Sequence, residues 1–172
     1  MSEVKRVAIL GAESSGKSTL AHALAVHYNT LWVPEYLREF VDTQARVPDE
    51  SDQYPIARTQ MERENAAYAK ASRFLFCDTT PAMTALYSRW YWGGVDAQLA
   101  LLERHHDYAF TLVTAPDNPW QADGLQRESE EVRQTIHVQV IELLHDRAIP
   151  YLLVSGSLHQ RMLQAGRLIN PA

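Results

Sequence analysis

The strongest chemical pattern in the sequence is a glycine-bounded loop that ends in a lysine and a serine. Residues 11–18 read G-A-E-S-S-G-K-S and match the phosphate-binding pattern G-x-x-x-x-G-K-[ST]. The two glycines let the backbone curl, so that its N–H groups and the start of a following helix face an anion. Lys17 then brings a positive charge to the β- and γ-phosphates, and the Ser18 hydroxyl is suited to ligate Mg²⁺. The residues expected to bind the nucleotide here are Glu13, Ser14, Ser15, Gly16, Lys17, Ser18 and Thr19.

A carboxylate follows an apolar run further along the chain, at a position typical of a metal-binding group. Residues 74–77 (F-L-F-C) favour a buried strand, and Asp78 comes directly after them. A Walker B carboxylate occupies this place and holds Mg²⁺ directly or through water. The alternative is that Asp78 caps the helix that begins near Pro81. Because the phosphate-binding loop is present, we assign Ser18 and Asp78 to the metal.

Another acidic residue ends the second apolar run. Glu35 follows T-L-W-V-P at residues 30–34, and Arg38 and Glu39 lie one helical turn further on. Glu35 is our candidate for the group that takes or orients the proton of an acceptor hydroxyl. The alternative is an acidic residue that only complements the dipole of a following helix. We expect Glu39 to have a structural role.

The segment after the fourth apolar run combines turn residues, a tryptophan and two arginines. We predict that residues 116–133 form a lid over the phosphates, because phosphoryl transfer needs added positive charge and exclusion of water. Arg127 and Arg133 are the available cations, unless they belong to a solvated helix start. Trp120 lies in a polar loop, where it could stack on a flat ring. Three aromatics at 90–92 (W-Y-W) could do the same, although packing into the core is the commoner role of such residues.

Strands and helices alternate along the chain. Short apolar runs predict strands over residues 4–10, 30–33, 74–77, 109–113 and 151–154. Helical spacing predicts helices over 19–27, 36–43, 55–72 (with Pro55 as the first residue), 82–92, 97–106 (capped by Asp96), 128–147 and 158–168. The alternation favours a mainly parallel sheet with helices on both faces and ligands at the carboxyl ends of the strands. The polar groups described above should therefore meet at one edge.

Composition sets wider limits. The 172 residues suit one domain, and 46% hydrophobic and 22% charged residues are ordinary for a globular protein. A net charge of −5 argues against broad nucleic-acid binding. The single cysteine, Cys77, excludes an intrachain disulfide and is expected to be buried. We find no signal peptide and no apolar run of membrane-spanning length, so we expect a cytoplasmic protein that binds neither nucleic acid nor membranes.

Four motifs together resemble a known family. They read G-A-E-S-S-G-K-S-T-L from residue 11, P-E-Y-L-R-E-F from residue 34, F-C-D-T from residue 76 and W-Q-A-D-G-L from residue 120. The sequence closely resembles the ribosylnicotinamide kinase domain of the bacterial trifunctional NAD-biosynthesis and regulator proteins, from about residue 4 to residue 154. The phosphate-binding loop alone would be unspecific, and the other motifs make the resemblance much more specific.

The resemblance implies an activity, a fold and a set of site residues. That family uses ATP and Mg²⁺ to phosphorylate the 5′-hydroxyl of nicotinamide riboside, which gives nicotinamide mononucleotide. The implied fold is the three-layer P-loop NTPase fold of nucleoside kinases, with strand order 2-3-1-4-5 and a lid after the fourth strand. The loop that would border the adenine is Ser155, Gly156 and Ser157. The acceptor would contact Glu35, Tyr36, Arg38, Trp120 and Asp123, and the residues expected to act in the transfer are Lys17, Glu35, Asp78 and Arg127.

Two departures from the family pattern limit what is carried over. The full-length relatives also have a DNA-binding helix-turn-helix and an adenylyltransferase domain with an H-x-G-H signature. This sequence contains neither, so repressor and adenylyltransferase roles are not extended to it. The family usually reads D-G-L-R, whereas residues 123–127 read D-G-L-Q-R, which displaces the lid arginine by one residue to Arg127.

Two other functions remain open. Another nucleoside or deoxynucleoside kinase would share the fold, Glu35 and Asp78. A P-loop ATPase that acts as a regulatory switch belongs to a different class, and the lack of an N-K-x-D motif argues against a GTPase. In each case we expect a single P-loop domain that spans residues 1–172.

Overall fold

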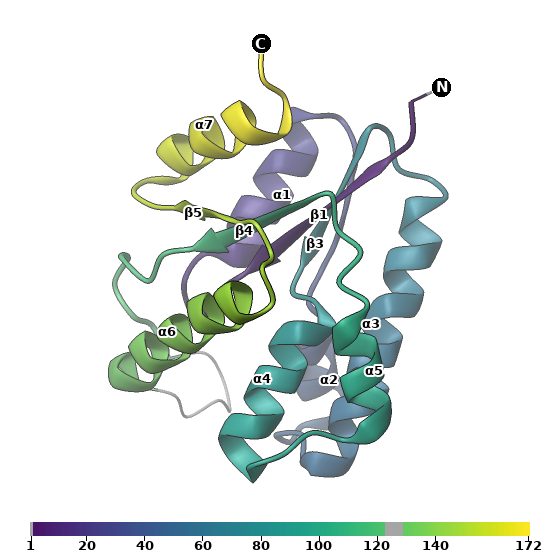
Figure 1. The fold of residues 1–172 in the computed structure, drawn as a ribbon, viewed down its shortest axis with the longest axis vertical. Helices are drawn as coiled ribbons and strands as arrows, with labels where there is room; N and C mark the ends of the chain where they lie inside the picture. The colour runs from purple at the N-terminus through teal and green to yellow at the C-terminus, as the bar shows by residue number, and fades with distance from the viewer. Residues whose placement is uncertain (1, 123–128) are drawn as a thin grey trace.

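A five-stranded parallel sheet forms the centre of the protein (Figure 1). The computed structural model describes residues 2–122 and 129–172. The sheet has the order β2-β3-β1-β4-β5, and every neighbouring pair of strands is parallel. Its strands are β1 (Lys5–Leu10), β2 (Leu31–Val33), β3 (Phe74–Asp78), β4 (Phe110–Thr114) and β5 (Leu152–Val154). The predicted α/β fold class and its strand order are confirmed.

Every predicted helix is present, with ends that differ by up to four residues. The described helices are α1 (Lys17–His27), α2 (Tyr36–Gln44), the short 3-10 helix η1 (Glu50–Asp52), α3 (Gln53–Tyr68), α4 (Pro81–Trp92), α5 (Ala97–Arg104), α6 (Glu130–Asp146) and α7 (Leu158–Ile169). Within the described part of the chain, no helix combines the length and the apolar character needed to cross a membrane.

Local capping explains two of the shifted helix ends. Asp49 and Asp52 form a capping box that starts η1, and η1 runs directly into α3. Pro55 is therefore the third residue of α3 and not the first, as the sequence predicts. The start of α6 lies two residues later than expected, because the Ser129 hydroxyl accepts a hydrogen bond from the Val132 N–H at 3.2 Å.

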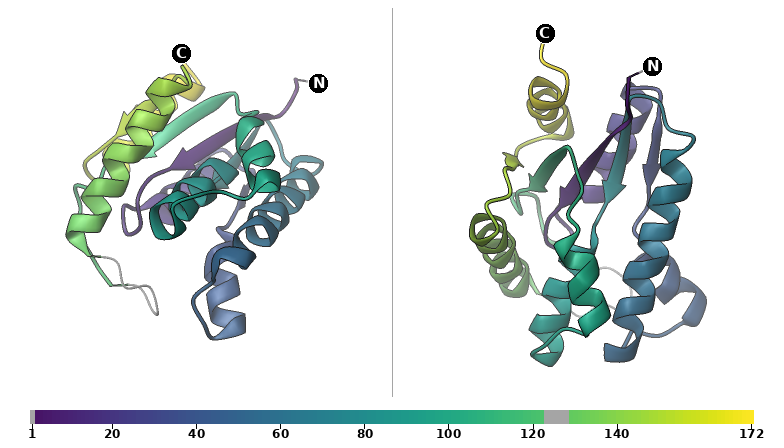
Figure 2. Two further views of the ribbon diagram at one scale, coloured as in Figure 1. Left: turned by 60° about the horizontal axis from the view of Figure 1, so that its bottom comes forward. Right: turned by 45° about the vertical axis from the view of Figure 1, so that its right-hand side comes forward.

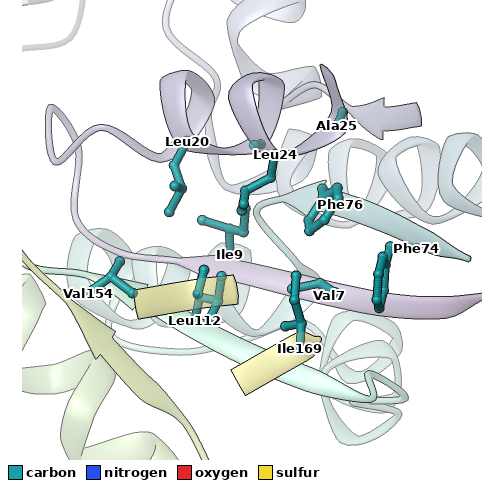
Figure 3. Close-up of a cluster of buried hydrophobic side chains, with 12 residues drawn as sticks. Val7, Ile9, Leu20, Leu24, Ala25, Phe74, Phe76, Leu112, Val154 and Ile169 are labelled. Carbon is teal, nitrogen blue, oxygen red and sulfur yellow. The ribbon is translucent and has the colours of Figure 1, made fainter. Parts of the chain in front are cut away.

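Helices cover both faces of the sheet (Figures 1 and 2), and each face carries a cluster of buried hydrophobic side chains. On one face, α1 and α7 pack on β1, β3 and β4 through residues such as Leu20, Leu24 and Ile169 (Figure 3). On the other face, α4 and α6 contribute side chains that include Ile136 and Val140. Strands that are buried on both faces need nearly continuous apolar runs, which is why short apolar runs in the sequence located them.

The carboxyl ends of the strands lie in line at one edge of the sheet. The last paired residues are Val33 with Cys77, Leu10 with Val113, and Thr114 with Val154. Ile9 pairs with Asp78, so β3 brings its terminal carboxylate beside the end of β1. The segments that follow these strands therefore share one edge, as the alternation of strands and helices predicts.

A buried acidic group lies beneath β3. Glu64 of α3 is fully buried, and it accepts hydrogen bonds from the Tyr108 hydroxyl at 2.8 Å and from Arg6 Nη1 at 3.4 Å. Burial raises the pKa of Glu64 from 4.5 to about 7, and the Tyr108 and Arg6 contacts only partly oppose this rise. Cys77 is a buried free thiol nearby, as predicted, and burial raises its pKa as well.

Glu64→Gln is expected to change how stability depends on pH. The folded protein keeps Glu64 protonated up to about pH 7, whereas the unfolded chain ionises it near pH 4.5. Its contribution to stability is therefore fully present below pH 4.5 and is lost as the pH rises to about 7. The glutamine variant should lack that decline and gain up to about 3 kcal/mol relative to wild type above pH 7. Urea unfolding from pH 4 to 8 measures this, with the exposed Glu62→Gln as control; parallel curves for Glu64→Gln and wild type would contradict it.

Candidate active site

The phosphate-binding loop joins β1 to α1 and lies against the end of β4. Gly11 has a φ of +153°, and a Cβ at this position would lie 2.2 Å from Thr114 Oγ1. Any side chain would therefore push the loop away from β4. The Ser15 hydroxyl donates to the Ala12 carbonyl at 2.6 Å and lies 2.7 Å from Thr114 Oγ1, which closes the loop on itself and on β4. The loop has the curled form that the sequence predicts.

Left-handed backbone conformations give this loop the shape of an anion nest. Ser14 has a φ of +58° and Gly16 a φ of +90°. Successive N–H groups in such a turn converge on one concave side, where they bind anions. Lys17, the first residue of α1, is only 8% exposed, and its Nζ donates to the Ala12 carbonyl at 3.3 Å. The ammonium group thus lies over the loop at a helix N-terminus, where a phosphate is favoured.

Ser18 and Asp78 are in direct contact. Ser18 Oγ donates to Asp78 Oδ2 at 2.5 Å, at the end of β3. Asp78 Oδ1 is buried and has no hydrogen-bond partner among the described residues, which is costly unless something binds it. A hydroxyl and a carboxylate are the oxygen ligands that Mg²⁺ takes together with substrate phosphates, so this pair fits the ion. The alternative role for Asp78 is excluded, because Thr80 is the N-cap residue of α4.

Glu35 borders a small pocket that is linked to the phosphate-binding loop through Tyr87. The pocket has a volume of about 30 Å³, and Thr79 and Tyr87 also line it. The Tyr87 hydroxyl accepts a hydrogen bond from the Glu13 N–H at 3.3 Å, which connects the pocket to the loop. Glu35 is the N-cap residue of α2 and is part of the lining of this pocket. It therefore stands where an acceptor hydroxyl could approach a phosphate bound by the loop.

Gln60 of α3 positions Glu35 and is absent from the residues predicted by sequence. Its Nε2 donates to the Pro34 carbonyl at 3.2 Å, and its Oε1 accepts from the Tyr36 N–H at 2.8 Å. The two peptide groups that flank Glu35 are thus held by one buried side chain. Nε2 also lies 3.5 Å from the Asp78 carbonyl, so the same residue ties β2 to β3. The sequence feature that could have identified Gln60 is its position in α3, where a polar residue stands among the residues that face the core.

The other predicted acceptor residues lie on α2 and after β4. Tyr36 begins α2, and its ring centroid lies 4.7 Å from the guanidinium carbon of Arg63. Arg38 is exposed on the same helix, and Trp120 is half-buried between β4 and α6. Two predicted residues lie outside the described part of the chain, and their roles stay predictions: Asp123 and Arg127.

Three aromatic residues at the end of α4 are not in the core, which corrects the commoner expectation for them. Trp90, Tyr91 and Trp92 are 38%, 53% and 37% exposed. The physical reason is that the buried residues of α4 end at Ser88, so that its last turn extends beyond the core. Tyr91 stacks on Tyr87, with ring centroids 6.2 Å apart and planes inclined by 15°. The stacked pair therefore adds an aromatic surface beside the Glu35 pocket.

The turn at residues 155–157 follows β5 as predicted. Its three backbone N–H groups donate to side chains at 2.7–2.9 Å: Gln164, Asp117 and Gln160. Burial tends to raise the pKa of Asp117, but hydrogen bonds from the Gly156 N–H and from Arg161 outweigh it and hold this pKa below its usual range. An ionised Asp117 thus joins the segment after β4 to the turn after β5.

Two buried arginines contact the phosphate-binding loop. Arg133, a predicted lid cation, is 2% exposed in α6 and donates to the Ser14 carbonyl. It is therefore not part of a solvated helix start. Arg161 of α7 is 4% exposed and donates to the Ser15 carbonyl. The sequence analysis did not identify Arg161. Its partners are main-chain carbonyls far away in the chain, and such carbonyls are present at every residue, so no residue type marks the contact.

A larger hollow of about 300 Å³ lies elsewhere, between α4, α5 and α6. Its wall includes the buried Glu103, which pairs with Arg89 at 2.6 Å and with Arg147 at 2.9 Å. No described residue of the predicted site lines this hollow. The larger of these two cavities is therefore not the one beside the predicted site residues.

Comparison with known proteins shows the family of the chain. A family described as an AAA domain matches residues 6–161, from β1 to α7. The chain belongs to this AAA-domain family. The match includes the phosphate-binding loop and residues from every strand of the sheet.

This AAA domain is similar to two curated proteins named as trifunctional NAD biosynthesis/regulator protein NadR. The relatives from Escherichia coli (strain K12) and Salmonella typhimurium (strain LT2) are each 30% identical to it over 156 residues. The matches cover 88% of this chain and 38% of each relative, so the chain spans well under half of their length. The resemblance that the four sequence motifs indicate is confirmed.

Solved structures share the fold. A crystal structure of NadR in complex with NR matches with a TM-score of 0.80 at 18% identity, over 96% of this chain and 51% of the other. NadR in complex with NAD and AMP-PNP matches with 0.81 at 17%, over 99% and 50%. Thymidylate kinase from Ehrlichia chaffeensis matches with 0.70 at 13%, over 98% and 100%. At these identities the comparisons establish the fold of the AAA domain.

Proposed function

We propose that this AAA domain is an ATP-dependent kinase that phosphorylates the 5′-hydroxyl of nicotinamide riboside to nicotinamide mononucleotide in NAD salvage. One arrangement carries the proposal: Lys17 and the Ser18–Asp78 pair share an edge of the sheet with the Glu35 pocket. In this proposal, the residues at this edge bind the phosphates, the metal ion and the acceptor hydroxyl next to one another. The choice of acceptor is supported by similarity to proteins named for NAD biosynthesis and to a NadR structure in complex with NR.

The proposed reaction assigns a task to each group. Loop N–H groups and Lys17 bind the β- and γ-phosphates of ATP, and Ser18 and Asp78 would hold Mg²⁺. The ion supplies charge neutralisation on the phosphate oxygens. Glu35 orients the 5′-hydroxyl and accepts its proton while the new P–O bond forms and ADP leaves. Because the transition state is loose, positioning contributes more than strong base catalysis.

The proposal includes the surroundings of the site. Residues 1–172 act as one kinase domain in which residues 116–133 are the lid, with Asp123 and Arg127 in it. Tyr36, Arg38 and Trp120 contact the acceptor, and the turn at 155–157 borders the adenine. We place this small-molecule reaction in the cytoplasm, without a nucleic-acid or membrane partner, and the net charge of −5 argues against broad binding to nucleic acid.

A panel of acceptors tests the function. The purified chain is incubated with Mg²⁺ and ATP plus nicotinamide riboside, thymidine, deoxyadenosine or no acceptor, and ADP and the phosphorylated product are quantified. We expect the highest kcat/KM for nicotinamide riboside. A higher value for a deoxynucleoside would favour the other nucleoside kinases, and ADP release that ignores the acceptor would favour an ATPase switch.

Trp120→Ala is expected to raise the KM for nicotinamide riboside by roughly 3- to 10-fold and to leave the KM for ATP nearly unchanged. A stacked aromatic contact contributes about 0.5–1.5 kcal/mol beyond area burial, and a cationic pyridinium ring adds attraction. Steady-state kinetics with each substrate varied in turn measures both constants. Trp90→Ala, at an exposed tryptophan outside the pocket lining, is the control. Equal changes in the two KM values would remove Trp120 from the acceptor site.

A further inference from the structure

Two buried arginines reach the phosphate-binding loop from opposite faces of the sheet. Arg133 belongs to α6, and its Nη1 and Nη2 donate to the carbonyls of Ser14 at 3.0 Å and Asn118 at 2.7 Å. Arg161 belongs to α7, and its Nη1 and Nη2 donate to the carbonyls of Ser15 at 2.5 Å and Ala115 at 3.0 Å. Each planar guanidinium therefore spans from one loop carbonyl to the segment after β4.

These contacts fix the orientation of two successive peptide groups. A trans peptide is planar, and its N–H points away from its C=O. When Arg133 holds the Ser14 carbonyl on the outside of the loop, the Ser15 N–H must point inward. When Arg161 holds the Ser15 carbonyl, the Gly16 N–H must point inward as well. The two arginines thus orient two N–H donors of the anion nest without reaching into it.

The ion pairs of Arg133 and Arg161 are consistent with a role in orienting the peptide groups of the loop. A buried guanidinium is costly unless it is paired, and here each pairs with a carboxylate: Glu130 at 2.6 Å for Arg133 and Asp117 at 2.5 Å for Arg161. Their remaining hydrogen bonds go mainly to main-chain carbonyls around the loop. A rotation of either loop peptide would break these bonds and turn a carbonyl oxygen toward the bound phosphates, where like charges repel.

We propose that Arg133 and Arg161 form an arginine clamp that preorganises the loop for the triphosphate. They are positioning residues, since they act through the peptide groups of Ser14 and Ser15. The proposal rests on the phosphate-binding part of the proposed function and is independent of the acceptor. Preorganised donors need no rearrangement when the anion binds, which is why the clamp affects affinity for phosphates.

Calorimetric titration with tripolyphosphate, ATP and adenosine tests the clamp. In Arg133→Gln, affinity for tripolyphosphate and ATP should fall by roughly 10- to 100-fold, the range for lost hydrogen bonds from a charged donor, while adenosine binding stays unchanged. Arg133→Lys should lose less, because an ammonium keeps the charge without the planar fork. Arg161→Gln should also weaken adenosine, because Arg161 Nε donates to the Gly156 carbonyl at 3.0 Å. The control is Arg167→Gln, at an exposed residue of the same helix as Arg161.

Three outcomes would overturn the clamp. Tripolyphosphate binding to Arg133→Gln at wild-type affinity is the first, and equal losses for adenosine and tripolyphosphate in that variant are the second. If Arg133→Gln does not fold, Arg133→Lys is tested in its place, by the ratio of its affinity for tripolyphosphate to its affinity for adenosine. The third outcome is that this ratio is the same in Arg133→Lys as in the wild type. A clamp-dependent loss of tripolyphosphate binding in a chain that does not phosphorylate nicotinamide riboside would refute the acceptor and leave the clamp standing.

Discussion

Lys17→Ala is expected to lower kcat for phosphoryl transfer by about 10²-fold or more. Removal of one preorganised charge from the transition state typically costs about 3 kcal/mol or more. Lys17 is largely buried at the start of α1, and the contact of its Nζ with the Ala12 carbonyl holds it over the loop. No other described lysine lies in the loop, and the buried Arg133 and Arg161 that contact it donate to its main-chain carbonyls. Turnover of nicotinamide riboside at saturating ATP and Mg²⁺ measures the loss.

The fold should survive this substitution, because alanine is the best helix former and Lys17 begins a helix. The thermal unfolding midpoint therefore serves as the check that a fall in turnover is chemical. Lys70→Ala, at an exposed lysine just beyond the end of α3, removes the same charge away from the site. A folded Lys17→Ala protein with near-normal turnover would contradict the role of Lys17 in transfer.

Local patterns predicted most of the fold. Strands that are buried on both faces have apolar runs bounded by turn residues, and each such run is a strand in the structure. The glycine spacing around Lys17 predicted a strand, a loop and a helix in the right order, because that chemistry is carried by neighbours in the chain. Strand order is different: it depends on how crossovers pack, and only the resemblance to a known family predicted it.

Sequence patterns did not predict the contacts between segments that are far apart in the chain. Gln60 holds Glu35 through main-chain groups at Pro34 and Tyr36, and Arg161 holds the loop in the same way. A carbonyl acceptor is present at every residue, so it adds no pattern to the sequence. Pro55 illustrates a smaller failure: the capping box that precedes it starts the helical turn two residues earlier than the proline indicates.

The structure separates the two candidate carboxylates by their surroundings. Asp78 is fully buried, and one of its oxygens contacts Ser18, the hydroxyl at the end of the phosphate-binding loop. Glu35 follows β2, which is separated from β1 by β3, and it borders the pocket beside Tyr87. The inner carboxylate is therefore next to the expected metal, and the outer one is next to the expected acceptor.

Glu35→Gln is expected to lower kcat by roughly 10²–10⁴-fold, the range for general acid–base groups, while Mg·ATP affinity stays nearly intact. Glutamine keeps the size and hydrogen-bonding capacity of the side chain and removes its charge, so the loss reports the carboxylate itself. Glu39→Gln is the matched control, because Glu39 lies one turn further on α2 and pairs with Arg63 on the surface. That variant should keep its turnover.

Asp78→Asn is expected to fail in a different way. An amide oxygen still faces Ser18, but the site has lost the negative charge that favours Mg²⁺, so the concentration of Mg²⁺ for half-maximal activity should rise. High Mg²⁺ should then restore part of the activity, since mass action offsets weaker binding. The same titration should leave Glu35→Gln equally slow at every Mg²⁺ concentration, because its defect lies in handling the hydroxyl proton. If Glu35→Gln is instead the variant that Mg²⁺ rescues, the two carboxylates must exchange roles.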